Sequence, residues 1–398
     1  MSEQKQSCIS KPLALLALSH MFTDLSQGAL PILLPLFKTS FGLTYAQIGI
    51  IVLAQNFTSS VIQPVFGYLT DRLSLPWLVP AGLLVSGLGM AITGLASSYE
   101  ILLLIVIFTG LGIAAFHPQG SKGAHAVSPP HLRGQSMAVF SVGGNLGNAF
   151  GSIFMTILLT LPGLISNTVY FCLPAALLAG LLWLNLSQIS PPPPARASAG
   201  TKAAASQSLP YAMIIILLVF IFIRSSIQAG LTTYIPLYYA DYLGGSHLYA
   251  GYLLSVFLLS GAVGTFIGGT LSDRLGRKTV LLGSMVLTFP LLWLLPYTSG
   301  LWTLALMAVT GMTLIASFAA TVVLAQEMMP GYEASAASLT IGFSIGMGGV
   351  GATLLGFVAD SFGVPSVFSV IALLPVMSWG LIHFLPGKLF RRDTIPAA

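Results

Sequence analysis

The chain has 398 residues, of which 55% are apolar and only 6% are charged. Soluble domains carry about 25% charged residues, so this composition excludes a soluble globular protein and indicates a chain dissolved in lipid. The net charge of +5 does not indicate nucleic-acid binding, because the basic residues lie singly between apolar runs and form no patch with aromatics. Cys8 and Cys172 match no metal-binding or redox spacing, so neither a metal site nor a cofactor is expected.

Twelve apolar segments are long enough to cross a bilayer, which requires about 20 apolar residues per helix. They are 12–37, 45–69, 76–97, 101–125, 135–160, 165–187, 210–239, 248–271, 279–297, 301–326, 335–359 and 364–385. The first segment is too long for a cleaved signal peptide, so we expect an uncleaved span. The sequence therefore predicts an all-α membrane protein with twelve transmembrane helices.

A polar stretch rich in Pro, Ala and Ser interrupts this pattern near the middle of the chain. It begins soon after the sixth apolar segment, contains four consecutive prolines at 191–194, and is typical of a linker without fixed structure. We predict an N-terminal six-helix bundle over 1–187, a cytoplasmic linker over 188–209, and a C-terminal six-helix bundle over 210–398. With the N-terminus inside, nearly all of the 15 Lys and Arg residues fall in cytoplasmic segments. Both termini are therefore expected in the cytoplasm, with the chain in a bacterial inner membrane.

Two stretches of ten residues repeat one another at a separation of about half the chain. Residues 67–76 are GYLTDRLSLP and residues 269–278 are GTLSDRLGRK. Nearly the same offset, 201 residues against 202 for the two stretches, relates Gln27 to Gln228, so the repeat extends beyond the loop. Such an offset indicates duplication of a whole structural unit, which is a common way to build a membrane transporter.

The second stretch resembles the cytoplasmic loop motif of the major facilitator superfamily at every position, whereas the first lacks the final Gly-Arg-Lys. The resemblance implies two pseudo-symmetric six-helix bundles that rock against each other around a central cavity. We assign gating to the charged residues of both copies, because an aspartate at a helix end can meet a base or a helix N-terminus. These residues are Asp71, Arg72, Asp273, Arg274 and Arg277.

The first span carries His20, Asp24 and Gln27, whose spacings of four and three place them on one helix face. An ionisable group in the hydrocarbon is costly, and it is therefore a functional candidate by default. We assign proton coupling to Asp24 and His20, and substrate contact to Gln27. The alternative is that Asp24 forms a permanent buried tie with His20 or Arg224.

The seventh span, the counterpart of the first, carries Arg224 with Gln228 one turn later. The planar fork of a guanidinium suits a carboxylate or a phosphonate, so we assign both residues to substrate binding. Arg224 would otherwise be locked to Asp24, or would lie close enough to the cytoplasmic end to extend its charge into water. Further amides that could line a cavity are Gln55, Asn56 and Asn145.

The fourth span contains Gly110-Leu-Gly112 followed by Phe116-His117-Pro118. This run resembles the fosmidomycin-resistance branch of the superfamily, and glycines of the fifth span resemble the motif of its drug/proton antiporters. The resemblance implies proton-driven efflux of a small, anionic phosphonate. Because His117 is an ionisable residue within a span, we assign it to proton coupling as well. The alternative for His117 is a packed histidine bonded to a neighbouring carbonyl.

The sequence thus predicts a monomeric secondary transporter that uses the proton gradient and binds a small-molecule substrate within the lipid bilayer. An importer or facilitator of a small anionic or sugar-like metabolite is the alternative among transporters. A non-transporting membrane receptor is the alternative of another class. An enzyme is not expected, because the chain shows no nucleophile–base pair, metal cluster or long soluble domain.

Overall fold

The computed structural model describes residues 10–73, 75–129, 133–189, 211–329 and 333–384. Helices account for all the regular structure in these ranges, and no strand occurs in them, which confirms the predicted all-α class. Two compact units are present, Met1–Leu43 with Ala54–Thr201, and Thr44–Leu53 with Lys202–Ala398. The predicted linker over 188–209 falls almost entirely outside the described residues, so it stays a prediction.

Some predicted spans correspond to more than one helical segment, because several spans are broken or are extended by a turn of another helix type. In the first part of the chain they are α1 (Lys11–Phe41), α2 (Tyr45–Ser60), α3 (Gln63–Arg72), α4 (Leu78–Thr93), α5 (Tyr99–Ala126), α6 (Arg133–Thr160), η2 (Leu164–Phe171), α7 (Cys172–Leu184) and α8 (Leu186–Ile189). In the second part they are α9 (Tyr211–Pro236), η3 (Leu237–Tyr242), α10 (His247–Leu275), α11 (Arg277–Leu294), η4 (Leu295–Tyr297), α12 (Leu301–Ile315), α13 (Ser317–Met328), α14 (Glu333–Phe362) and α15 (Val364–His383).

Ten helical segments in the described residues are long and apolar enough to cross a membrane. The 31-residue α1 and the shorter apolar α4 lie where the remaining two predicted spans were expected. The observed helices are therefore consistent with twelve spans. The second predicted span consists of α2 and α3, because the chain turns at residues 61–62, just before Pro64 at the start of α3.

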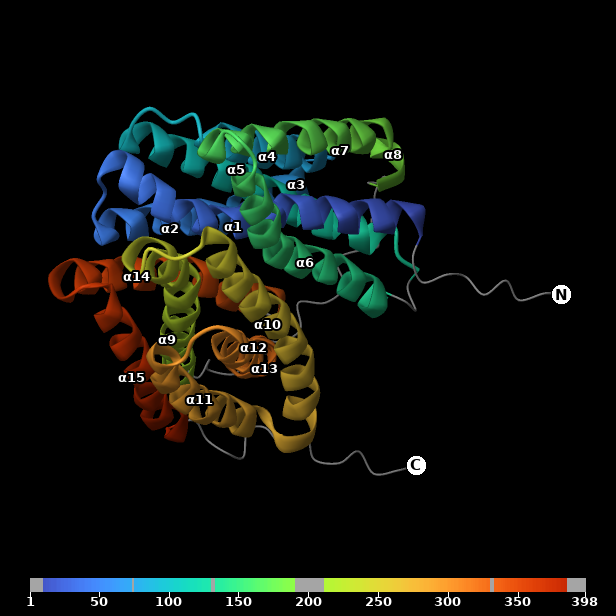
Figure 1. Cartoon of the computed structure of the whole chain (residues 1–398). Helices are drawn as coiled ribbons and strands as arrows, with labels where there is room; N and C mark the ends of the chain where they lie inside the picture. Colours follow the sequence, from blue (N-terminus) through green and yellow to red (C-terminus); the bar gives the residue numbers. More distant parts are fainter. Residues whose placement is uncertain (1–9, 74, 130–132, 190–210, 330–332, 385–398) are drawn as a thin grey trace, which may run out of the picture. The chain divides into compact units, whose positions relative to one another are not determined.

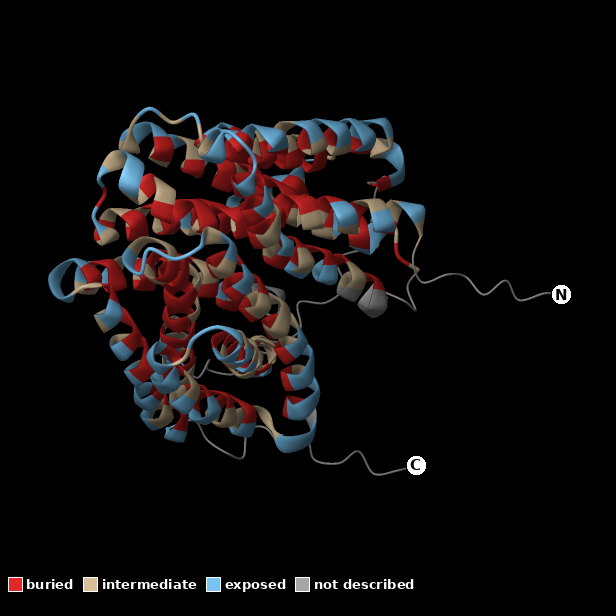
Figure 2. Ribbon diagram, viewed as in Figure 1, coloured by how far each residue is buried: buried red, intermediate tan, exposed pale blue. Residues whose placement is uncertain are grey.

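The outer helices expose large apolar side chains. Much of α7 is exposed (Figure 2). Its Leu173, Leu177 and Leu184 are 66%, 64% and 82% exposed. A soluble protein rarely exposes such a contiguous apolar surface. Lipid is the solvent that this surface fits, as the composition predicts.

In the first unit, α1 packs along α6 and α4 packs along α5 (Figure 1). Glycines make both contacts close. A Cβ atom on Gly143, Gly147 or Gly151 of α6 would lie 2.2, 2.0 or 2.3 Å from a carbonyl oxygen of α1. Small residues at four-residue spacing let backbones approach in lipid, which accounts for the spacing of these three glycines. Gly112 brings α5 to α4 in the same way, since its Cβ would lie 2.5 Å from the Ser86 nitrogen.

In the second unit, α9 packs along α14, and α10 packs along α12. The sequence predicts Gly261, Thr265 and Gly269 as the close-packing residues of α10. The closest backbone approaches instead involve Gly264 and Gly268, whose Cβ atoms would lie 2.2 and 2.0 Å from carbonyl oxygens of Met312 and Ala316. The sequence therefore predicts the packing face of α10 only in part, because this segment contains two sets of small residues at four-residue spacing.

The start of α2 belongs to the second unit and is capped there by a carboxylate from α14. The Asp360 Oδ1 and Oδ2 atoms accept hydrogen bonds from the backbone nitrogens of Tyr45 and Ala46 at 2.7 and 2.9 Å. The Tyr45 hydroxyl donates to Asp241 Oδ2 at 3.1 Å. A negative charge at a helix N-terminus satisfies free amides and complements the helix dipole, so Asp360 fixes the first turn of α2.

The close contact of α1 with α6 generates a prediction. Gly147→Ala places a methyl group against the Met21 carbonyl, and overpacking of this kind costs about 1–3 kcal/mol. We expect the apparent melting temperature of the detergent-solubilised protein to fall by about 3 °C or more. Gly180→Ala on α7 is the matched control, because no atom lies within 4 Å of its added Cβ. Equal melting temperatures for the two variants would contradict this packing.

Candidate functional site

Three ionisable side chains meet inside the first unit. The His20 Nε2 atom lies 3.3 Å from Asp24 Oδ2, one turn away on α1. The His117 Nε2 atom, contributed by α5, lies 2.8 Å from Asp24 Oδ1. All three side chains are largely buried, with exposed fractions of 13%, 12% and 20% for His20, Asp24 and His117. The structure therefore brings together the three residues that the sequence assigns to proton coupling.

The hydrogen bonds of His20 fix where protons can lie. Its Nδ1 atom is 2.8 Å from the backbone oxygen of Phe140, which can only accept, so Nδ1 carries a hydrogen. An ionised Asp24 also only accepts, yet its Oδ2 atom faces His20 Nε2. One proton between these two atoms, on the imidazole or on the carboxyl, makes the contact attractive. Removing that proton leaves two acceptors facing each other in a site of low dielectric.

His20 is enclosed by two aromatic rings and by a glycine of α6. The Phe140 ring stacks on His20 with centroids 4.2 Å apart, and the Phe116 ring lies 5.9 Å away. Gly144 of α6 supplies the space, because a Cβ atom there would lie 2.5 Å from His20 Nε2 and 2.7 Å from Asp24 Oδ2. Phe140 and Gly144 are the residues that sequence reasoning missed. The one available signal was their four-residue spacing on the glycine-rich face of α6.

A second polar group lies inside the other unit, around Arg224 of α9. Arg224 is only 1% exposed. Its Nη1 atom donates to Gln228 Oε1 at 3.0 Å, and its Nη2 atom donates to Ser225 Oγ at 3.1 Å and Ser344 Oγ at 2.5 Å. The guanidinium carbon lies 5.3 Å from the centre of the Phe318 ring. The structure therefore bonds Arg224 to Gln228, one turn along α9, and adds Ser344 of α14 and Phe318 of α13.

The Arg224 charge is not neutralised by the side chains described here. No carboxylate forms an ion pair with it among the described residues. Its Nε atom is buried and has no hydrogen-bond partner. Burial to this degree also rules out a guanidinium extended into water at a helix end. A buried cation with an unused donor is costly, so the group is suited to binding an anion that enters from outside.

The predicted substrate amides have different environments. Gln55 is buried, and its Nε2 donor has no partner. Gln27 and Asn56 are half-buried, and the Asn56 backbone oxygen accepts from Ser60. Asn145 is exposed. Of these four amides, Gln55 resembles Arg224 most closely, because it too has a buried donor with no protein acceptor.

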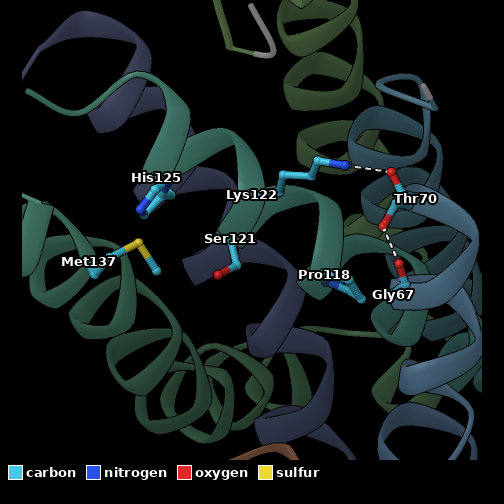
Figure 3. Close-up of a pocket in the computed structure, with 7 residues that line it drawn as sticks. All are labelled: Gly67, Thr70, Pro118, Ser121, Lys122, His125 and Met137. Atoms are coloured by element: carbon cyan, nitrogen blue, oxygen red, sulfur yellow. Dashed lines mark hydrogen bonds between the residues drawn. The ribbon is translucent and has the colours of Figure 1, made fainter. Parts of the chain in front are cut away.

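A cavity of about 470 Å³ lies along α5, in the turns that follow His117 (Figure 3). Its lining is Gly67, Thr70, Pro118, Ser121, Lys122, His125 and Met137. The Lys122 Nζ atom donates to the Thr70 backbone oxygen across the cavity, from α5 to α3. Lys122 and His125 are both exposed and lie in the wall of this cavity, beside Pro118.

The predicted gating residues are described only in part. The side chains of Asp71 and Asp273 lie outside the described residues. Arg72 packs its guanidinium 4.5 Å from the centre of the Tyr68 ring, and Arg274 is exposed. Arg277 lies at the start of α11, where it donates to Ser272 Oγ at 2.7 Å and pairs with Glu327 Oε1 of α13 at 3.3 Å. This ion pair joins two helices of the second unit.

Comparison with known proteins identifies relatives over nearly the whole chain. The family model of the Major Facilitator Superfamily matches residues 16–340 and again 217–396. The chain is 35% identical over 380 residues to the fosmidomycin resistance protein of Escherichia coli (strain K12), covering 94% of this chain and 93% of that protein. It is also 35% identical over 395 residues to an uncharacterised transporter of this type from Bacillus subtilis (strain 168), covering 96% and 95%.

Solved structures share the fold at lower sequence identity. A bacterial homologue of the human lysosomal transporter Spinster, in an inward-facing and occupied conformation, matches with a TM-score of 0.77 at 17% identity. That match covers 94% of this chain and 97% of the other. The nucleoside transporter NupG matches with a TM-score of 0.70 at 16% identity, covering 94% and 98%.

The environment of Arg224 generates a prediction about stability. Replacing an uncompensated buried charge with an apolar side chain of similar length removes its desolvation cost. We expect Arg224→Met to leave the apparent melting temperature of the ligand-free protein unchanged or a few degrees higher. The matched control is Arg277→Met, which separates Glu327 from its partner and is expected to give no such gain. A fall of several degrees for Arg224→Met would show that Arg224 is a structural tie.

Proposed function

Because the chain belongs to the major facilitator superfamily, we propose that it is a proton-coupled exporter of small anionic toxic compounds. Fosmidomycin, a phosphonate, is the expected cargo, since the similarity to the fosmidomycin resistance protein extends over 94% of the chain. The observation that carries the proposal is the cluster of His20, Asp24 and His117, in which an imidazole nitrogen faces each carboxylate oxygen at 3.3 and 2.8 Å.

The cluster serves as the proton-binding element in this proposal. Its proton lies between His20 Nε2 and Asp24 Oδ2, while His117 stabilises the other carboxylate oxygen. Loss of the proton leaves a net negative charge and a repulsive contact inside an apolar bundle, which is costly in hydrocarbon. The loaded and unloaded states therefore favour different arrangements of α1 against α5, and this difference can drive a transport cycle.

Arg224 serves as the anion-binding element. Charge-assisted hydrogen bonds to a phosphonate would use the buried Nε donor and neutralise the guanidinium. Ser344 and Gln228 hold the guanidinium through its two terminal nitrogens, so its orientation is fixed before the anion arrives. A neutral analogue gains no ion pair here, and the site therefore selects for charge.

The direction of transport is the second part of the proposal. With both termini in the cytoplasm, protons moving inward would drive the cargo outward through alternating access of the two units. The E. coli relative, named for resistance, supports this direction. An importer of a small anionic metabolite would use the same Arg224 donor. Drug hypersensitivity of a deletion strain favours export, whereas failure to grow on an anionic nutrient favours import.

Asp24→Asn tests the proposed proton coupling. The amide keeps the size of the side chain but cannot exchange a proton, so we expect accumulation of fosmidomycin in acid-inside inverted vesicles to fall to background. Substrate counterflow without a gradient should weaken as well, because the variant resembles the protonated state, from which the cargo is released. His125→Gln, outside the cluster, serves as the control and should leave driven uptake unchanged. Gradient-driven uptake by Asp24→Asn at the rate of the unmodified protein would contradict the proposal.

A further inference from the structure

We propose that His20, Asp24 and His117 also bind a divalent transition-metal ion of the Zn²⁺ class. Each residue offers one ligand atom, and the three atoms lie within 4.8 Å of one another. The binding inference rests on geometry alone and does not require that the protein transports protons. Only its consequence for transport rests on the proposed function.

The ligand atoms select the class of ion. Two imidazole nitrogens and one carboxylate oxygen are borderline ligands that suit Zn²⁺, Co²⁺ or Ni²⁺, whereas Mg²⁺ and Ca²⁺ prefer sets made only of oxygen. Zinc with three protein ligands keeps a fourth position for water or another small ligand. The cluster has this composition, and the partial exposure of His117, at 20%, leaves a side from which an ion can enter.

The ligand atoms lie within 4.8 Å of one another and must close around the ion, because the contacts of the cluster use both carboxylate oxygens. Zinc lies about 2.0–2.1 Å from imidazole nitrogen and carboxylate oxygen, so tetrahedral ligands are about 3.3 Å from each other. His20 Nε2 and Asp24 Oδ2 already have this separation of 3.3 Å. His117 Nε2 and Asp24 Oδ1 lie closer, at 2.8 Å, and their hydrogen bond must open by about half an ångström to admit the ion.

The surroundings of His20 resemble those of a metal ligand. Its Nδ1 atom bonds to the Phe140 carbonyl, which directs the lone pair of the neutral ring at Nε2 toward the centre of the cluster. Metal-binding histidines are commonly oriented by such a bond from the second ring nitrogen to a carbonyl or carboxylate. Gly144 keeps the centre free of a side chain, since its Cβ would reach His20 Nε2 at 2.5 Å.

Metal and proton compete for the same lone pairs. The ion replaces the proton between His20 and Asp24, so affinity falls as the pH falls. Few other charges bear on the cluster. Among the described side chains of α4, α6, α7 and α8, which pack on α1, the one ionisable group is the Cys172 thiol at the start of α7. Lys122 and His125 of α5 lie in the adjacent cavity. A bound metal therefore blocks the proton site. If transport is coupled to that proton, as proposed, Zn²⁺ inhibits transport.

The test is zinc binding by tag-free, detergent-solubilised protein, measured by isothermal titration calorimetry at pH 7.5 and at pH 5.5. We expect about one Zn²⁺ per chain and at least ten-fold weaker binding at the lower pH, since protons occupy the ligands there. His20→Gln and His117→Gln should each weaken binding by ten-fold or more, because even outer-shell changes cost 10–100-fold. His125→Gln is the matched control and should bind as the unmodified protein does. Mg²⁺ should not compete.

Two measurements on the unmodified protein, Co²⁺ absorption and its displacement by Zn²⁺, test the site even if a variant is unstable. Co²⁺ bound to the unmodified protein should give the visible absorption of a tetrahedral site, and Zn²⁺ should abolish that absorption. Zinc affinity that is unaffected by either histidine substitution, or absent at both pH values, overturns the proposal. Absence of zinc binding together with loss of driven uptake in Asp24→Asn would reject the metal site and leave the proposed transport function standing. Zinc binding together with unimpaired driven uptake in Asp24→Asn would reject the proposed proton coupling and leave the metal site standing.

Discussion

The proposed transport cycle depends on one carboxylate held between two imidazoles inside an apolar bundle. Asp24 faces His20 on one oxygen and His117 on the other, at 3.3 and 2.8 Å. In water such contacts contribute little, because each partner is well solvated alone. In a lipid-immersed unit the same charge without partners is costly, so the state of one proton changes the energy of the whole contact between α1 and α5.

The packing of the first unit makes this contact possible. The glycines of α6 bring its backbone against α1, and Gly144 leaves the small space in which His20 and Asp24 meet. Because the backbones are so close, the Phe140 carbonyl reaches His20 Nδ1 and determines which ring nitrogen faces the carboxylate. A stripe that serves close packing along most of its length thus also positions the site. This explains why packing and site residues share one helix face.

The second unit places a cation in an equally apolar interior, without a carboxylate partner among its described residues. Arg224 is held by Gln228, Ser225 and Ser344, all of them neutral. Neutral partners orient the guanidinium but leave its charge uncompensated, whereas Arg277 near a helix end is paired with Glu327. The contrast distinguishes an arginine that joins helices from one that is suited to binding an anion.

The sequence predicts the features that depend on local pattern. Long apolar runs predict the spans, and the four-residue spacing predicts that His20 and Asp24 share a face of α1. The rarity of ionisable residues in spans selects His117 and Arg224 as candidates, but not their contacts, because these join helices far apart in the chain. Gly144 and the Phe140 carbonyl could not be predicted, since one contributes space and the other a backbone atom. The register of the α10 glycines was ambiguous for a related reason, because neighbouring glycines fit the same spacing.

Proton release on cargo binding tests the central claim most directly, in purified protein held in weakly buffered detergent solution near pH 7. If the proton shared by His20 and Asp24 is exchanged for an anion at Arg224, adding fosmidomycin should release about one proton per binding event. The His20→Gln variant should release much less. Fosmidomycin that binds without any change in bound protons would contradict the account.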